Sequence, residues 1–524
     1  MTFARDAHPV LISPDMPWPP PGAEKLRKRW PSWAAWWSGD LDDLRTHAST
    51  TAPGGYWEKH RDKELKDRQM HLPLAGDIAG TSAELVFSDS PTLQFSADVQ
   101  DAWDELAQTI GWGNSLVEAG EVCAALGGVY LRPAWERDLF DHPLSTSVRA
   151  DEAIPEFRFG MLIGVVFVTN LGERDGFQWR WLEHHEPGQI RHELWKGTPN
   201  NIGKLMGLAD HPDTKHLAVG ESGGVIDTRP IRARGILVEY IPNQLPQPLD
   251  RQPYGRADIQ GLETELDALD AAWASWMRDL DLGKGRVLVS AEMLDSVAPS
   301  SRSTGHVQTA TDKFFGRHRR STPAKVFDED AKVFTPLSGL PMESGNGLAP
   351  ITPVQFAIRV QEHADTCAAL VEQIVSRAGY APQSFGMHVE GQLSGTAIRR
   401  REHRSHQTKN RKRQYARPAL ERFAETLMLI NAVIFGRPRP TERPTLEWRE
   451  TDQADPKETA ETINTLKLAE AISIETSVQM AHPEWDEKQV TDEVERIQAE
   501  REAKRAENPL TGYETPDALD TAEP

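Results

Sequence analysis

A segment with two glycines and a lysine, Gly197–Lys204 (GTPNNIGK), comes closest in this chain to a nucleotide-binding phosphate loop. A phosphate loop places four residues between its glycines and a Ser or Thr directly after the lysine, where the hydroxyl binds magnesium. Here five residues separate the glycines, and Leu205 follows the lysine. The segment does not predict nucleotide binding, which argues against a motor ATPase.

Three histidines lie close in sequence to glutamates that could share a metal ion with them: His184, His185 and His192, beside Glu183, Glu186 and Glu193. If 178–184 and 189–196 form a hairpin, some of these side chains converge. The alternative, which we favour, places them on a solvated sheet face. The chain has no H-E-x-x-H and no G-x-S-x-G motif, and neither cysteine has a catalytic signature. We therefore predict no catalytic residue, no metal site and no cofactor.

The largest local charge is a run of bases from Arg399 to Arg417, opposed only by Glu402, in a chain whose net charge is −20. At about 100° per residue, these bases point all around a helix and cannot all face one duplex. We predict pairing with acids of the same or a neighbouring subunit, ahead of contact with DNA phosphate. The candidates are Arg399, Arg400, Arg401, Arg404, Lys409, Arg411, Lys412 and Arg413.

The composition sets limits on the elements that must position these residues. A length of 524 residues predicts about three to five compact units. With 79 acids against 59 bases, the chain is a poor candidate for wrapping nucleic acid over its whole surface. Two cysteines cannot form a disulfide framework and favour a reducing compartment. The longest apolar run, 157–168, is too short to span a bilayer, and we predict neither a membrane segment nor a secretion signal.

Residues 61–240 predict a mixed α+β region, with antiparallel sheet and helices on one side of it. A helix is expected at Asp101–Ile110. Strands are expected at Ala83–Phe87, Thr92–Phe95, Gly127–Arg132, Phe157–Thr169, Phe177–His184 and Gly188–Lys196.

Long helices follow. The segment 258–281 has an apolar seam with steps of four and three residues, typical of a helix that packs against other helices. Its members are Leu262, Leu266, Leu269, Trp273, Trp276 and Leu280. Strand-like pieces at 286–290 and 332–337 surround a basic insert, and a second helix is expected at 353–378. A third helix should run from 394 to 435, with a kink or break at Pro418.

The segment 379–395 (GYAPQSFGMHVEGQLSG) contains four glycines and predicts a loop. Residues 456–505 predict two or more polar helices, and the acidic tail 508–524 predicts disorder. At the other end, Trp30, Trp33, Trp36 and Trp37 have helical spacing after a proline-rich stretch. This N-terminal segment predicts either an arm that docks on a partner or a helix that caps the chain's own core, and we weigh the two equally.

The order of these elements resembles the portal proteins of tailed bacteriophages, specifically of phages that infect actinobacteria. The resemblance rests on the order of the elements and on their general sequence character over most of residues 70–500. The stretches that carry it are LPLAGDIAGTSAELVFSDSP (72–91), FRFGMLIGVVFV (157–168), WRWLEHHEPGQIRHELWKG (179–197), YGRADIQGLETELDALDAAWASWMRDL (254–280) and SGTAIRRREHRSHQTKNRKRQYARPALERF (394–423).

The resemblance implies a non-enzymatic protein that forms a ring of about twelve subunits at one vertex of the capsid. Its channel would pass double-stranded DNA during packaging and ejection. The implied partners are the major capsid protein, the terminase large subunit and a head–tail adaptor. The implied location is the virion, after assembly in the host cytoplasm.

The resemblance also implies a division of the chain: an N-terminal arm (1–60), a wing (61–255), a stem helix (256–285), a clip (286–350), a second stem helix (351–378), a tunnel loop (379–395), a kinked helix with wing return (396–455), a helical crown (456–505) and a disordered tail (506–524). The implied tunnel-loop residues are Ser384, Phe385, Gly386, Met387, His388, Val389, Glu390, Gly391 and Gln392. The alternative function is another oligomeric phage structural protein, such as a minor capsid or connector component, although adaptors are typically much shorter.

Overall fold

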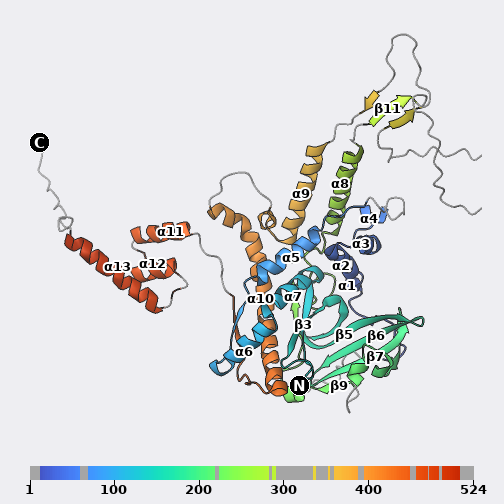
Figure 1. The fold of residues 1–524 in the computed structure, drawn as a ribbon, viewed down its shortest axis with the longest axis horizontal. Coiled ribbons are helices and arrows are strands. Elements are labelled where there is room, and N and C mark those ends of the chain that lie inside the picture. Colours follow the sequence, from blue (N-terminus) through green and yellow to red (C-terminus); the bar gives the residue numbers. More distant parts are fainter. Residues whose placement is uncertain are drawn as a thin grey trace, which may run out of the picture. The chain divides into compact units, whose positions relative to one another are not determined.

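A computed structural model describes residues 12–59, 69–218, 224–282, 286–290, 334–337, 352–354, 359–386, 395–448, 456–469, 471–482, 485 and 487–507. The chain divides into two compact units (Figure 1). Unit 1 comprises residues 1–23, 79–258 and 379–524, and unit 2 comprises residues 24–78 and 259–378. The mixed helix-and-sheet fold predicted from the sequence is confirmed.

Antiparallel sheet forms the centre of unit 1. The largest sheet has the order β4-β5-β6-β7-β8, with β9 also paired to β7, and a second sheet has the order β10-β2-β3. The strands are β1 (Thr92–Gln94), β2 (Gly128–Ala134), β3 (Leu144–Arg149), β4 (Ala153–Arg158), β5 (Met161–Arg174), β6 (Phe177–Glu186), β7 (Gln189–Thr198), β8 (Asn201–Met206), β9 (Val225–Asp227), β10 (Glu239–Pro242) and β14 (Thr445–Glu447), which pairs with β1.

The helices of unit 1 are α6 (Ala97–Thr109), α7 (Trp112–Leu126), α10 (Gly395–Phe435), α11 (Pro456–Leu468), α12 (Ile474–Ala481) and α13 (Glu487–Glu507). α5 (Leu74–Phe87) crosses from unit 2 into unit 1. The N-terminal residues 15–18 lie along β8, since the amides of Asp15 and Trp18 donate to the carbonyls of Gly203 and Asn200. These residues cover an edge strand whose backbone groups would otherwise be unpaired.

Unit 2 contains short N-terminal helices and a pair of long ones. The helices are α1 (Glu24–Arg27), α2 (Trp30–Ser38), α3 (Leu41–His47), α4 (Tyr56–Lys59), α8 (Glu263–Leu282) and α9 (Val360–Ala378). A small sheet, β12-β11-β13, is formed by β11 (Arg286–Ser290), β12 (Phe334–Leu337) and β13 (Thr352–Val354). α8 and α9 run side by side, and β11 follows α8 by a few residues (Figure 1).

One sequence-based expectation about an element was wrong. Residues Ala83–Phe87 are not a strand but the end of α5, whose buried positions recur at Leu74, Ile78, Ser82 and Val86, one every fourth residue. Of the kink or break expected at Pro418, the break is absent because α10 continues through this residue, and the kink stays a prediction. The sequence analysis also missed α7, which has glycines at 113 and 120.

Most other elements lie where they were expected. The stretch 157–169 divides into β4 and β5, which meet at a turn formed by Phe159 and Gly160. α8 begins five residues later than predicted and α9 seven residues later, while β13 occupies 352–354. The tail 508–524 and most of the basic insert lie outside the described residues. No helix in the described part of the chain is long and apolar enough to cross a membrane.

Candidate functional site

The segment that follows α9 is held against α10 by hydrogen bonds. Gly379 has a φ of +101°, and a Cβ there would lie 3.0 Å from the Thr408 hydroxyl. That hydroxyl donates to the Gly379 carbonyl at 2.6 Å, and the Ala381 amide donates to the Ser405 hydroxyl at 2.8 Å. Because glycine adopts positive φ without strain, this residue lets the chain turn sharply at the end of α9. The stretch 379–386 is therefore fixed to one face of α10.

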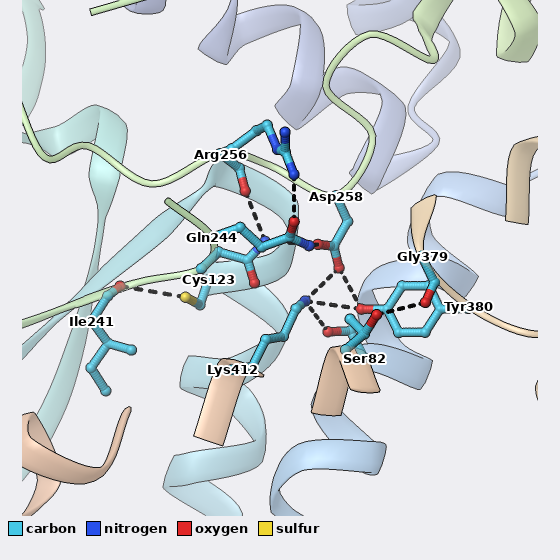
Figure 2. Close-up of polar contacts among 11 residues, drawn as sticks. Ser82, Cys123, Ile241, Gln244, Arg256, Asp258, Gly379, Tyr380 and Lys412 are labelled. Carbon is cyan, nitrogen blue, oxygen red and sulfur yellow. Dashed lines mark hydrogen bonds and ion pairs between the residues drawn. The ribbon is translucent and has the colours of Figure 1, made fainter. Parts of the chain in front are cut away.

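Asp258 lies buried beside this segment and accepts four hydrogen bonds from side chains (Figure 2). Its Oδ1 accepts from the amides of Asn243 at 2.7 Å and Gln244 at 3.0 Å. Its Oδ2 accepts from the Tyr380 hydroxyl at 2.8 Å and from Lys412 Nζ at 2.6 Å. All of these residues belong to unit 1. The carboxylate joins the chain just before α8 to the chain just after α9.

Lys412 completes this cluster from α10. Its ammonium group donates to Asp258, to the Ser82 hydroxyl at 2.6 Å and to the Tyr380 hydroxyl at 2.9 Å, so its three protons all have acceptors. Burial, reinforced by the charge of Asp258, raises the pKa of Tyr380 well above its usual range. Because each proton of this buried ammonium group has an acceptor, and one acceptor is a carboxylate, the cluster serves as a structural anchor.

Backbone contacts fix the position of Asp258. Its amide donates to the carbonyl of Ala124 at the end of α7, and the Asn243 amide donates to the carbonyl of Gly127, both at 2.9 Å. Gly255 lies so close to the Gly127 carbonyl that a side chain there would collide with it. The stretch 255–258 is thus held against the start of β2.

A cavity of about 20 Å³ lies beside the cluster, with room for one water molecule. Ser82, Asn243 and Lys412 contribute polar groups, and the rest of its lining is largely apolar. Cys123 also lines it, but burial raises the pKa of this thiol to about 12. A thiol in that state is a poor nucleophile. The cavity has neither the size nor the reactive groups of an active site.

In unit 2, three carboxylates on one side of α8 hold the N-terminal helices. Glu263 accepts from the Trp33 indole at 2.8 Å, and Asp267 accepts from the backbone amides of Tyr56 and Trp57. Asp270 accepts from the Trp57 indole at 2.9 Å and from the Leu72 amide at 2.9 Å. Trp33, Trp36 and Trp57 are fully buried. Of the two interpretations of the N-terminal tryptophans, the helix that caps the chain's own core matches this structure.

The apolar seam of α8 changes character along its length. Leu262, Leu266 and Leu269 are buried within the subunit, whereas Trp273, Trp276 and Leu280 are half-buried. Trp276 stacks on His363 of α9, with ring centroids 6.2 Å apart. Only the later half of the seam is therefore open to a neighbouring helix.

Ion pairs show that α8 and α9 are antiparallel. Glu265, at the start of α8, pairs with Arg377 at the end of α9. Asp279, near the end of α8, accepts from Arg359 at 3.0 Å and from His363 at 2.9 Å. The two helices form a hairpin whose far end leads into the strands β11–β13.

The basic run on α10 divides into buried and exposed residues. Lys412 is buried in the cluster above, and Arg413 is buried with its guanidinium 4.5 Å from the centre of the Trp448 ring. Lys412 thus pairs with an acid of its own subunit, which is one of the two kinds of pairing expected, whereas Arg413 contacts an aromatic ring. Arg404 and Arg411 are exposed, and Lys409 is half-buried. The side chains of Arg399, Arg400 and Arg401 lie outside the described residues.

The expected tunnel loop is described only at its start. Pro382–Phe385 form a short 3₁₀ turn, in which the Ser384 hydroxyl lies 2.9 Å from that of Ser405. The Phe385 ring packs edge-on against Tyr380. Met387, His388, Val389, Glu390, Gly391 and Gln392 lie outside the described residues.

The histidines lie in the expected hairpin of β6 and β7, but His184 and His185, which point to opposite faces of the sheet, are both buried rather than solvated. His184 and His185 are each 1% exposed, and they pair with Glu193 at 3.0 Å and Glu183 at 2.7 Å. Burial, together with the charge of Arg191, lowers the pKa of His184 to about 4. In the described part of the chain, no three metal-binding side chains converge.

The sequence analysis missed the residues that anchor the 379–386 segment, namely Ser82, Asp258, Tyr380, Ser405 and Thr408. Asp258 and Tyr380 are 122 positions apart, and Ser82 and Lys412 are 330 apart, so no local spacing connects them. The available signal was a lysine followed at helical spacing by two alanines and a phenylalanine (Ala416, Ala419, Phe423), which places Lys412 on the buried face of α10.

Comparisons with known proteins identify one family whose model matches this chain. The family model described as "Phage portal protein, SPP1 Gp6-like" matches residues 242–506, slightly more than half of the chain. Among solved structures, chains in the virion of a native gene transfer agent particle and in the necks of native and empty particles are 15–16% identical, with TM-scores of 0.37–0.38. The matches cover 83% of this chain and 98% of those chains. No curated protein matches. On the strength of the family match, which includes α8, α9 and α10, the chain belongs to the SPP1 Gp6-like family of phage portal proteins.

Proposed function

We propose that this protein forms the portal ring at the unique vertex of a phage-type capsid. The ring surrounds a channel through which double-stranded DNA enters during packaging and leaves during ejection. The observation that carries the proposal is the sequence of elements inside the region of the family match: an antiparallel helix hairpin, then a segment pinned to a long helix.

Each region has a proposed role in the ring. The hairpin of α8 and α9 is the stem, and 286–350 is the clip, where the terminase large subunit and later the head–tail adaptor dock. The segment 379–395 is the tunnel loop, and 456–505 is the crown. The sheets of unit 1 belong to the wing, which contacts the major capsid protein. Within the N-terminal segment, residues 24–59 stabilise the subunit rather than form a free arm, because their buried tryptophans pack inside unit 2.

The proposal describes a conduit and not an enzyme. The family is one of structural proteins, and the cluster around Asp258 is built to hold the backbone, since its lysine, carboxylate and hydroxyl groups bond to one another. The net charge of −20 per subunit supports a channel in which DNA slides, because an acidic surface repels phosphate.

Negative-stain electron microscopy with light-scattering mass tests the proposal on the purified chain. We expect rings of about twelve subunits with an axial hole. Trp273→Glu should block ring formation and leave folded subunits, because Trp273 lies on the half-buried later part of the α8 seam. Ser275→Glu is the matched control, since it adds the same charge at an exposed position of the same helix. A chain that stays monomeric at high concentration would count against the portal function.

A further inference from the structure

The exposed face of α10 carries bases that form no ion pair with an acid in the described part of the chain. Arg404 and Arg411 are both exposed and are seven residues apart, so they lie on one side of the helix, about 10 Å from each other along its axis. The buried residues Ser405, Lys412 and Ala416 lie about 100° around the helix from these two arginines. In the described part of the chain, neither arginine forms an ion pair or a side-chain hydrogen bond.

The exposed face of α9 carries acids in the same situation. Asp365 and Glu372 are exposed and also seven residues apart, on the side of α9 that is opposite to buried Cys367 and Ile374. The Asp365 carboxylate accepts a hydrogen bond from the Gln361 amide at 2.8 Å. Neither acid forms an ion pair with any described residue. Arg377, the one base on α9, is paired with Glu265 of α8.

We propose that these two faces bind each other between copies of this chain, so that Arg404 and Arg411 of one subunit pair with Asp365 and Glu372 of the next. The charges are opposite, the spacing is seven residues on both helices, and none of the four side chains forms an ion pair with a described residue of its own subunit. An interface between two different faces of identical chains closes into a ring when the rotation between subunits permits. The inference rests on the proposed ring and names the contact that builds it.

DNA is a less favourable occupant of the α10 face. A duplex gains affinity with every phosphate that a base neutralises, and many copies of two exposed arginines around one channel would hold the DNA in place. The acidic face of α9 would in addition repel phosphate, whereas it attracts α10 of a neighbour. A second copy therefore uses both faces, and DNA would use only one.

Charge-swap variants test the pairing, with electron microscopy and light-scattering mass as the readout. Arg404→Glu/Arg411→Glu and Asp365→Lys/Glu372→Lys should each reduce the fraction of subunits in rings more than tenfold, because like charges then face each other. All four positions are exposed, so the subunits should stay folded by circular dichroism. An equal mixture of the two variants should form rings again, since each subunit then alternates with the other and every interface regains opposite charges.

Asp98→Lys/Asp101→Lys is the matched control, because it reverses two exposed acids on another helix, α6. It should form normal rings. The pairing is overturned if the mixture of the two variants stays unassembled. It is also overturned if the control loses its rings while the α9 variant keeps them. A third contrary result would be that Arg404→Glu/Arg411→Glu forms rings but no longer retains a short DNA duplex. Wild-type protein is measured first: its failure to form rings would refute the portal proposal itself, whereas rings that survive every variant would refute only this pairing.

Discussion

Asp258 of unit 1 and Asp270 of unit 2 are both buried carboxylates, but they are neutralised differently. Asp258 accepts from an ammonium group, Lys412, as well as from amides and a hydroxyl. Asp270 accepts from the indole of Trp57, the backbone amide of Leu72 and the ring of His71 at 2.8 Å. One site is an ion pair inside the subunit. The other is a carboxylate surrounded by hydrogen-bond donors from the N-terminal segment.

The difference follows from what each site holds together. Unit 1 must fix a helix that carries a strongly basic sequence, and burying one of its lysines requires a counter-charge. In unit 2, α8 must hold the N-terminal segment in place. This segment provides backbone amides and indoles as the hydrogen-bond donors to the carboxylates of α8. Removing the carboxylate of Asp258 should therefore lower the free energy of unfolding more than removing that of Asp270, because it leaves an uncompensated charge behind.

The largest effect is expected for Asp258→Asn. The substitution leaves the Lys412 ammonium buried without an opposite charge, which destabilises proteins by about 3–5 kcal/mol. Urea unfolding of the purified protein, followed by circular dichroism, measures the loss. The double variant Asp258→Asn/Lys412→Met removes both charges and should recover most of it. A double variant as unstable as the single one would show that the ion pair is not what stabilises the cluster.

Asp270→Asn should cost less, about 1–3 kcal/mol, because the loss is of hydrogen bonds to donors rather than of a counter-charge. The amide of Leu72 donates directly to this carboxylate, so its hydrogen exchange should accelerate. Ala268→Asn is a suitable control, since Ala268 is exposed on the same helix. If exchange at Leu72 were unchanged in Asp270→Asn, the carboxylate would not be the anchor of this segment.

The sequence predicted the elements of these regions better than their contacts. α10 was predicted to within one residue at its start, because a glycine-rich loop precedes it, and β6 and β7 were predicted because Gly176 and Gly188 mark their turns. Asp258 was missed because its partners Tyr380 and Lys412 are more than a hundred positions away. Asp267 and Asp270 lie on α8 away from its apolar seam, and no local sequence pattern distinguishes such buried acids from acids that face water. The available signal was the large number of tryptophans before residue 60. Buried indole N–H groups need hydrogen-bond acceptors, and the acids of α8 supply them.

Asp279→Asn should have a smaller effect, under about 1 kcal/mol, although Asp279 pairs with a cation as Asp258 does. The side chain of Arg359 is 66% exposed, so water screens this pair. The effect should shrink further in high salt, whereas that of Asp258→Asn should not. The same unfolding experiment at low and high salt separates the two. A salt-insensitive loss at Asp279 would mean that exposure does not set the strength of these pairs.

The smallest expected effect is a difference in pH dependence between two acids of α8. Burial raises the pKa of Asp267 above 3.8, despite the bonds from Tyr56 and Trp57, so folding favours its protonated form. The hydrogen bonds from His363 and Arg359 lower the pKa of Asp279 below 3.8, so folding favours its charged form. Stability from Asp279 is therefore present above pH 3.8 and lost as the pH falls through its lowered pKa, and stability from Asp267 is lost as the pH rises through its raised pKa.

Unfolding curves between pH 7 and pH 3, for wild type, Asp267→Asn and Asp279→Asn, measure both contributions. Relative to wild type, Asp279→Asn should become less costly as the solution is acidified, because the wild-type carboxylate then loses its charge. Asp267→Asn should become more costly over the same range, because wild type gains the protonated form that its buried site favours. If the stability of the two variants changed with pH in parallel, hydrogen bonds from neutral donors and from cations would stabilise these carboxylates equally. The distinction drawn above between Asp258, paired with a cation, and Asp270, bonded to neutral donors, would then not hold.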